Sequence, residues 1–182
     1  METKAPYALR TAIALSAVAV FACASAPVSD AADAGAYLGN LLDVTRFASL
    51  DPASDPQADH RPAGCALGAA RIEDATLEFD TNDCVVFWVG VPLVAPLRAG
   101  EPLRLVTTHG SLVAREPALA HLRIDLEDEV FVDRTVPIPS PDSIDLENVT
   151  PTQPHAAGSL VRVHLHNHGQ NTWRLVSLGR RP

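Results

Sequence analysis

The chain has 182 residues, of which 47% are hydrophobic and 20% charged, with 22 acidic residues against 14 lysines and arginines. This length fits one domain. The formal charge of −8 disfavours a general affinity for nucleic acid, because the phosphates would be repelled. Aromatic residues make up 5% of the chain, which is too few for a base-stacking surface. We therefore expect a globular domain with no nucleic-acid partner.

Residues 1–22 have the three parts of a secretory signal peptide. Lys4 and Arg10 give a positive start, and an uncharged apolar run from Thr11 to Ala22 follows. This run is too short to cross a bilayer, which takes about 20 apolar residues. The sequence therefore predicts export across the inner membrane and removal of this segment.

The end of this segment allows two cleavage schemes. Val20-Phe21-Ala22-Cys23 resembles the lipobox of bacterial lipoproteins, and the resemblance implies that Cys23 is lipidated and anchors the protein to a membrane of the cell envelope, the outer membrane in particular. Ordinary cleavage at the small residues Ala22-Cys23-Ala24 would instead release a free periplasmic or secreted protein. Residues 23–35 are small and polar and predict a flexible tether, which leaves residues 36–182 as the folded domain.

Two cysteines remain for the folded domain, Cys65 and Cys84. In an oxidising compartment they are expected to form a disulfide. A zinc site made from the same pair lacks the Cys-x-x-Cys spacing that such sites use.

The folded domain reads as a succession of short apolar runs separated by turn residues. Residues 36–47 fit a helix, although residues 41–50 of the same run fit an extended strand equally well, and the proline-rich residues 51–64 predict a loop. Two pairs of runs predict hairpins: 121–126 with 130–136, and 160–166 with 172–178. Trp88 and Trp173 are expected in the core. We expect a single antiparallel β-sandwich with an immunoglobulin-like or cupredoxin-like Greek key.

One run carries a candidate metal site. On a strand, His164 and His166 would project from the same face, about 6.6–6.8 Å apart, and paired imidazoles at this spacing can bind Zn²⁺ or Cu²⁺. His168 would continue the face, and a further ligand could come from elsewhere in the chain. The alternative is that His164 and His166 belong to a solvated strand face, with Arg174 opposite His164 in the predicted hairpin.

No motif for catalysis stands out. The sequence has no Gly-x-Ser-x-Gly elbow and no phosphate-binding glycine loop. The acidic residues around Glu127-Asp128-Glu129 lack the spacing of a calcium loop and indicate a solvated turn. We expect a non-catalytic binding or structural protein of the bacterial envelope, with an unidentified protein partner and no cofactor. A periplasmic Cu or Zn protein that uses the His-x-His strand is the alternative.

Overall fold

The computed structural model describes residues 39–57, 65 and 68–181. The predicted signal peptide (1–22), Cys23 and the predicted tether (23–35) lie outside these residues. Within the described ranges, no helix is both long enough and apolar enough to cross a membrane.

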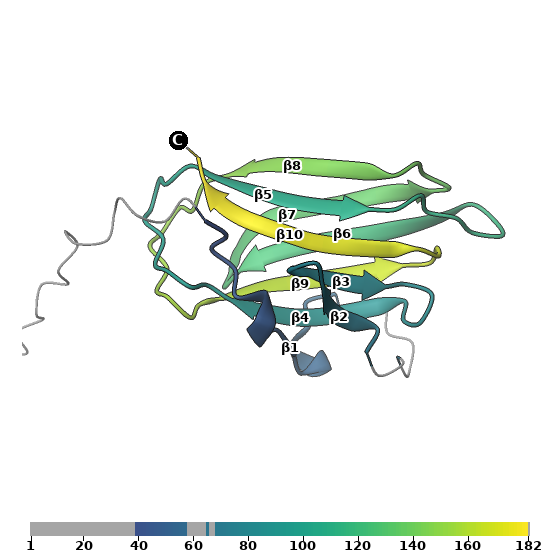
Figure 1. Cartoon of the computed structure of the whole chain (residues 1–182), viewed down its shortest axis with the longest axis horizontal. Helices are drawn as coiled ribbons and strands as arrows, with labels where there is room; N and C mark the ends of the chain where they lie inside the picture. The colour runs from purple at the N-terminus through teal and green to yellow at the C-terminus, as the bar shows by residue number, and fades with distance from the viewer. Residues whose placement is uncertain (1–38, 58–64, 66–67, 182) are drawn as a thin grey trace, which may run out of the picture. The chain divides into compact units, whose positions relative to one another are not determined.

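Ten antiparallel strands form two five-stranded sheets, which confirms the predicted antiparallel β-sandwich. One sheet has the order β1-β4-β9-β6-β7 and the other has the order β2-β3-β10-β5-β8 (Figure 1). The strand bounds are β1 Ala48–Ser49, β2 Ala70–Glu73, β3 Thr76–Asp80, β4 Val86–Pro92, β5 Leu103–His109, β6 Ala118–Leu126, β7 Glu129–Ile138, β8 Ser143–Val149, β9 Leu160–Asn167 and β10 Thr172–Arg180.

From β3 to β10 the chain changes sheet at every step except between β6 and β7. This connectivity is a jelly roll, which contains two Greek keys. The predicted hairpin at residues 121–136 is confirmed, since β6 pairs with β7 from Ala118 to Ile138.

The second predicted hairpin is wrong. Both of its strands exist, but β9 pairs with β4 and β6, whereas β10 pairs with β3 and β5 in the opposite sheet. Each strand contributes alternate apolar residues to the same core from opposite sides. The connection between them therefore crosses the sandwich instead of reversing within one sheet. Sequence periodicity does not distinguish these two arrangements, because both bury every second residue.

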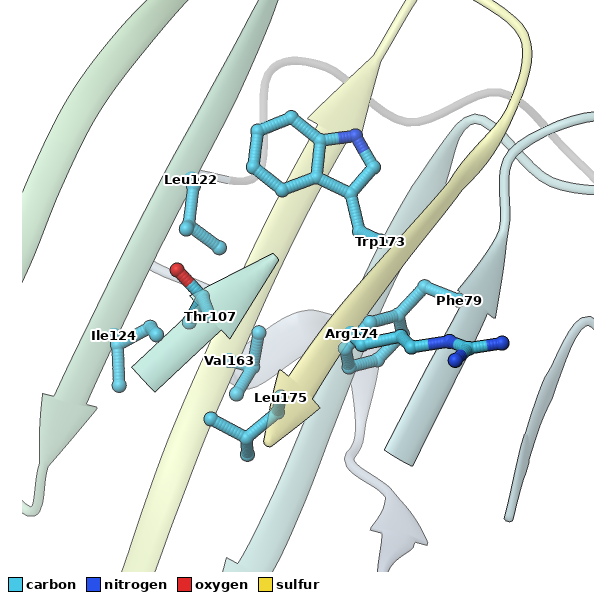
Figure 2. A pocket seen from close by; sticks show the side chains of 8 residues that line it. All are labelled: Phe79, Thr107, Leu122, Ile124, Val163, Trp173, Arg174 and Leu175. Carbon is cyan, nitrogen blue, oxygen red and sulfur yellow. The ribbon is translucent and has the colours of Figure 1, made fainter. Parts of the chain in front are cut away.

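The core lies between the sheets and is well filled. Trp173 is buried in it, as predicted, together with Phe79, Leu165 and Leu175. Figure 2 shows a cavity lined by Phe79, Trp173 and Leu175 among others, from which the guanidinium of Arg174 points away. The cavity offers about 10 Å³ to the centre of a water-sized sphere, which is room for one water molecule at most. It is a packing gap and not a ligand site.

The segment before β2 is neither the helix nor the long strand expected for residues 36–47. Its described part runs along the sandwich, with Leu41 and Leu42 buried. Two short 3₁₀ turns follow, Val44–Arg46 (η1) and Pro52–Ser54 (η2). η2 lies in the predicted loop 51–64, and residues 58–64 of that loop lie outside the described ranges. The predicted disulfide joins Cys65 and Cys84, whose Cα atoms are 4.7 Å apart.

Candidate functional site

His164 lies on the outer face of the first sheet, in β9, where Trp88 of β4 and Arg123 of β6 are directly opposite it. Its ring is fully buried. The prediction that His164 and His166 belong to a solvated face is therefore wrong, since both side chains are buried. Arg174, which was expected opposite His164, lies on β10 of the other sheet and faces Glu78 and Thr108 instead.

Residues 51–57 cover this part of the sheet and explain the burial of His164. Asp55 follows η2, and its carboxylate accepts a hydrogen bond from Nδ1 of His164, with N···O distances of 3.0 and 3.1 Å. Asp55 is itself buried. Next to this pair, Nε1 of Trp88 donates to Oγ of Ser54 at 3.1 Å. Trp88 is buried as predicted, although it lies under η2 on the outer face and not between the sheets.

The structure does not gather the predicted metal ligands into one group. The rings of His166 and His168 are neighbours, with centroids 4.3 Å apart. His164 instead contacts the ring of His121 at 5.7 Å, and Nε2 of His121 donates to Asp133 at 2.7 Å. Across the described ranges, no set of three or more His, Cys, Asp or Glu side chains could hold a metal ion. Metal binding by His164, His166 and His168 stays a prediction.

The histidines outside this strand have separate surroundings. His109 packs against Trp173 at a ring-centroid distance of 4.5 Å. Nε2 of His155 bonds to the carboxylate of Glu129, 3.2 Å away, and Glu129 also accepts from the backbone N–H of Thr152. These contacts fasten loops and strand ends to the sandwich.

The outer face of the second sheet carries an ionic cluster centred on Glu78 of β3. This carboxylate is 1% exposed and pairs with Arg71 and Arg174 on the two flanking strands. Burial raises the pKa of Glu78, but hydrogen bonds from Glu73 and Arg174 and the two positive charges outweigh it and hold the pKa below its usual value. The hydrogen bond to Glu78 raises the pKa of Glu73. This cluster joins β2, β3 and β10.

The same outer face also contains a groove of about 300 Å³ between β5 and β10. Its lining comprises Arg104, Val106, Ser177, Gly179, Arg180 and Arg181. The register explains this set, because Arg104 lies opposite Gly179 and Val106 lies opposite Ser177. The small residues Ser177 and Gly179 of β10 therefore lie opposite the longer residues Val106 and Arg104 of β5.

A β-bulge sets the position of this floor. The register of β10 against β5 shifts between Leu175 and Ser177, which places Val176 as the extra residue. Asn40 fixes the bulge from the other side of β10: its side-chain amide donates to the carbonyl oxygen of Val176, and its side-chain oxygen accepts from the N–H of Leu178, each at 3.1 Å. The groove is therefore built on a strand held on both edges.

The groove contains no group that could serve as a general base or a strong nucleophile. Its polar side chains are three arginines, which cannot lose their protons in proteins, and the hydroxyl of Ser177. The arrangement can hold and orient a ligand by hydrogen bonds and charge.

Sequence analysis did not find Asp55 or the groove. Asp55 lies in a segment with loop composition, and its partner is 109 residues away. Arg104 and Arg181 line the same groove because β5 pairs with β10. The sequence analysis paired residues 172–178 with residues 160–166 instead and did not predict this pairing. The adjacent arginines 180 and 181 at the end of an apolar run were the one local signal.

Comparisons with known proteins add little beyond the fold. No family model matches the chain, and no curated protein matches it. A solved structure described as "CBM4 structure and function" is similar at 14% identity and a TM-score of 0.31, with 62% of this chain and 79% of that chain covered. At this TM-score the likeness carries no argument about ligand or activity.

Proposed function

We propose that the chain is a β-sandwich of a bacterial cell envelope that binds a ligand without transforming it. The observation that carries the binding role is the groove between β5 and β10, which combines a volume of about 300 Å³ with arginine and serine side chains and has no general base. Ligand pockets start at about this size. The metal-binding alternative has less support, because the two neighbouring rings of His166 and His168 supply only part of a ligand set.

Residence in the envelope is supported by two independent features. The N-terminal 22 residues have the layout of a signal peptide, and Val20-Phe21-Ala22-Cys23 resembles a lipobox. The disulfide between Cys65 and Cys84 fits an oxidising compartment, since such bonds are rare in a reducing cytosol. We infer that Cys23 carries the lipid and that the folded domain faces the periplasm or the cell exterior.

The anchor is tested by expressing the full chain and its Cys23→Ser variant in a bacterium and separating membranes from soluble periplasm. The wild type is expected in the membrane fraction, with an acyl mass on the mature N-terminus. Cys23→Ser is expected to accumulate as uncleaved precursor. A variant that is processed and membrane-bound like the wild type would overturn the anchor.

The binding role is tested by ligand-detected NMR on the purified folded domain, with a panel of neutral, cationic and anionic small molecules. Binding is expected for at least one class, with recovery of the unchanged compound. Gly179→Leu is the matched variant: a Cβ added there meets no described atom closer than the Gly39 oxygen at 3.9 Å, and the rest of the leucine side chain is expected to occupy the groove. If no class binds, or if Gly179→Leu binds as the wild type does, the proposal fails.

A further inference from the structure

We propose that the groove between β5 and β10 binds a phosphate monoester group carried on a small organic or lipid ligand. This inference rests on the proposed binding function and names the chemistry of its ligand. The residues that carry it are Arg104 and Arg181, with the hydroxyl of Ser177 as a supporting donor.

The charge balance of the groove favours a doubly charged anion. Arg180 forms an ion pair with Glu101 and donates a second hydrogen bond to the carbonyl oxygen of Pro96 at 2.8 Å. Arg104 and Arg181 are exposed, and neither has an ion-pair partner among the described residues. Glu101, which is not part of the lining, compensates Arg180, and Arg180 lies opposite the buried Leu103. The charges of Arg104 and Arg181 are left, and together they match the charge of a phosphate monoester at neutral pH.

This surplus is local and contrasts with the rest of the molecule. The whole chain has a formal charge of −8, which opposes a general affinity for anions. Other arginines on the two outer faces, such as Arg123 and Arg174, are paired with carboxylates. A field of positive sign confined to one groove attracts an anionic group to that groove alone, because charges further away than about 8–10 Å are screened in physiological salt.

The geometry suits a tetrahedral oxyanion better than a carboxylate. A carboxylate lies in one plane and is satisfied by one guanidinium fork. Arg104 comes from β5, whereas Ser177 lies on β10 and Arg181 directly follows it. Donors from two strands can serve more than one of the three terminal oxygens of a phosphate. The backbone N–H of Arg181 is bonded to the carbonyl oxygen of Pro102 at 3.0 Å, so this residue is held at the rim of the groove.

The volume indicates that the phosphate is attached to something larger. An inorganic phosphate would fill only part of about 300 Å³. Next to the groove, β8 presents two exposed apolar side chains, Ile144 and Leu146, and Leu146 lies directly opposite Val106. The attached group could be the sugar of a soluble phosphate ester or the acyl region of a lipid, and the two sources differ in whether they contact this apolar strip.

The test uses the folded domain and three probes: inorganic phosphate, glucose 6-phosphate, and vesicles of phosphatidylcholine containing phosphatidic acid, with pure phosphatidylcholine vesicles as the blank. Calorimetry is expected to show glucose 6-phosphate or the phosphatidic acid vesicles binding more tightly than inorganic phosphate. Arg104→Gln and Arg181→Gln are each expected to weaken binding about tenfold, the loss of one charge-assisted contact at an exposed site. Gly179→Leu is expected to abolish binding with all charges retained.

Arg115→Gln is the matched control, since Arg115 is an exposed arginine outside the groove and its removal changes the net charge equally. Leu146→Ser separates the two sources: it is expected to weaken vesicle binding alone if the ligand is a lipid, and to leave both forms unchanged if the ligand is soluble.

The proposal is overturned if none of the phosphate probes binds, or if Arg115→Gln weakens binding as much as Arg104→Gln. One further outcome is that a neutral or cationic compound from the panel binds to the wild type and not to Gly179→Leu, while the phosphates bind to neither. In that case the phosphate assignment fails and the proposed binding function stands. If nothing binds, both fail.

Discussion

Asp55 and His164 are 109 residues apart in the sequence, yet Nδ1 of His164 lies 3.0 Å from Oδ2 of Asp55 and both side chains are buried. The contact therefore joins two polar side chains from segments far apart in the chain. The contact fastens η2 over Trp88 on the outer face of the first sheet. Residues 51–57, which have the composition of a loop, therefore pack against the outer face of the first sheet.

Removing the acceptor is expected to loosen this cover. Asp55→Ala leaves a buried imidazole N–H without its partner, which should lower the free energy of unfolding by about 2–4 kcal/mol. Asp55→Asn keeps an acceptor oxygen and should cost less. Urea denaturation measures the loss, and a red shift in tryptophan emission reports exposure of Trp88. Asp142→Ala, at an exposed site, is the control. If Asp55→Ala has the same free energy of unfolding as Asp142→Ala, the contact between Asp55 and His164 does not stabilise the fold.

The second predicted effect concerns the ionic cluster of the other outer face. Glu78 is buried between Arg71 and Arg174, so Glu78→Gln removes the shared counter-charge of two arginines. We expect a loss of about 1–3 kcal/mol in the free energy of unfolding, measured by urea denaturation in low salt. Glu116→Gln, an exposed change elsewhere, should be neutral. Equal midpoints for the two variants would show that the cluster adds nothing to stability.

The acid stability of the domain should follow from the same cluster and from Asp133. Hydrogen bonding from His121 lowers the pKa of Asp133, and the pKa values of Glu78 and Asp80 are also lowered. A depressed carboxyl pKa contributes stability that is complete above the unfolded value, about 3.9–4.3, and is lost as pH falls through the folded value. Glu73, with its raised pKa, opposes this trend.

The free energy of unfolding, measured from pH 7 to pH 2, should therefore fall mainly below about pH 4. In Glu78→Gln this fall should be smaller. A free energy of unfolding that stays constant between pH 4 and pH 2 would contradict the lowered pKa values of these three carboxyl groups.

The sequence predicted β6 and its hairpin with β7, but it predicted neither the pairings of β9 and β10 nor the strand β8 within the proline-rich residues 137–154. Leu122, Ile124 and Leu126 alternate with polar residues in β6, and the charged turn at Glu127 follows, so both the strand and its hairpin could be predicted. The connection between β9 and β10 has similar local chemistry but crosses between sheets. Only the packing of both strands against one core decides this, and that packing depends on residues far away in the chain.

The same dependence separates the two candidate sites. His164 and His166 could be placed on one strand face from their spacing, and that placement holds. The burial of His164 could not be predicted, because it depends on the contact with Asp55, in a segment with loop composition. The arginine groove depends on the register of β10 against β5 and on the bulge at Val176, neither of which leaves a mark in the local sequence.

The disulfide gives a prediction about redox conditions. Cys65 and Cys84 are 19 residues apart, and closing a loop of this length stabilises the folded state by about 3 kcal/mol in the chain-entropy model. Reduction with dithiothreitol, or replacement of both cysteines by serine, should lower the free energy of unfolding by that amount. Mass spectrometry of unreduced peptides verifies the bond. Unchanged stability after confirmed reduction would show that the bond does not contribute.

The histidine pair gives the last prediction, which addresses the metal-binding alternative. His166 and His168 have neighbouring rings, whereas Nδ1 of His164 is already bonded to Asp55. Two imidazoles complete only half of a tetrahedral site, so Cu²⁺ and Zn²⁺ are expected to bind weakly and to be displaced by competing imidazole. His168→Ala should remove this binding, and His155→Ala, at a histidine held by Glu129, should not.

Isothermal titration of the purified domain with each metal measures both variants. Tight binding at one ion per chain that survives His168→Ala would contradict this account. Such a result would place a metal site elsewhere and would require ligands from outside the described residues. Weak binding that both variants retain equally would mean that neither His168 nor His155 holds the ion. The double variant His164→Ala with His166→Ala then tests the strand pair, and unchanged binding in it would refute the His-x-His hypothesis.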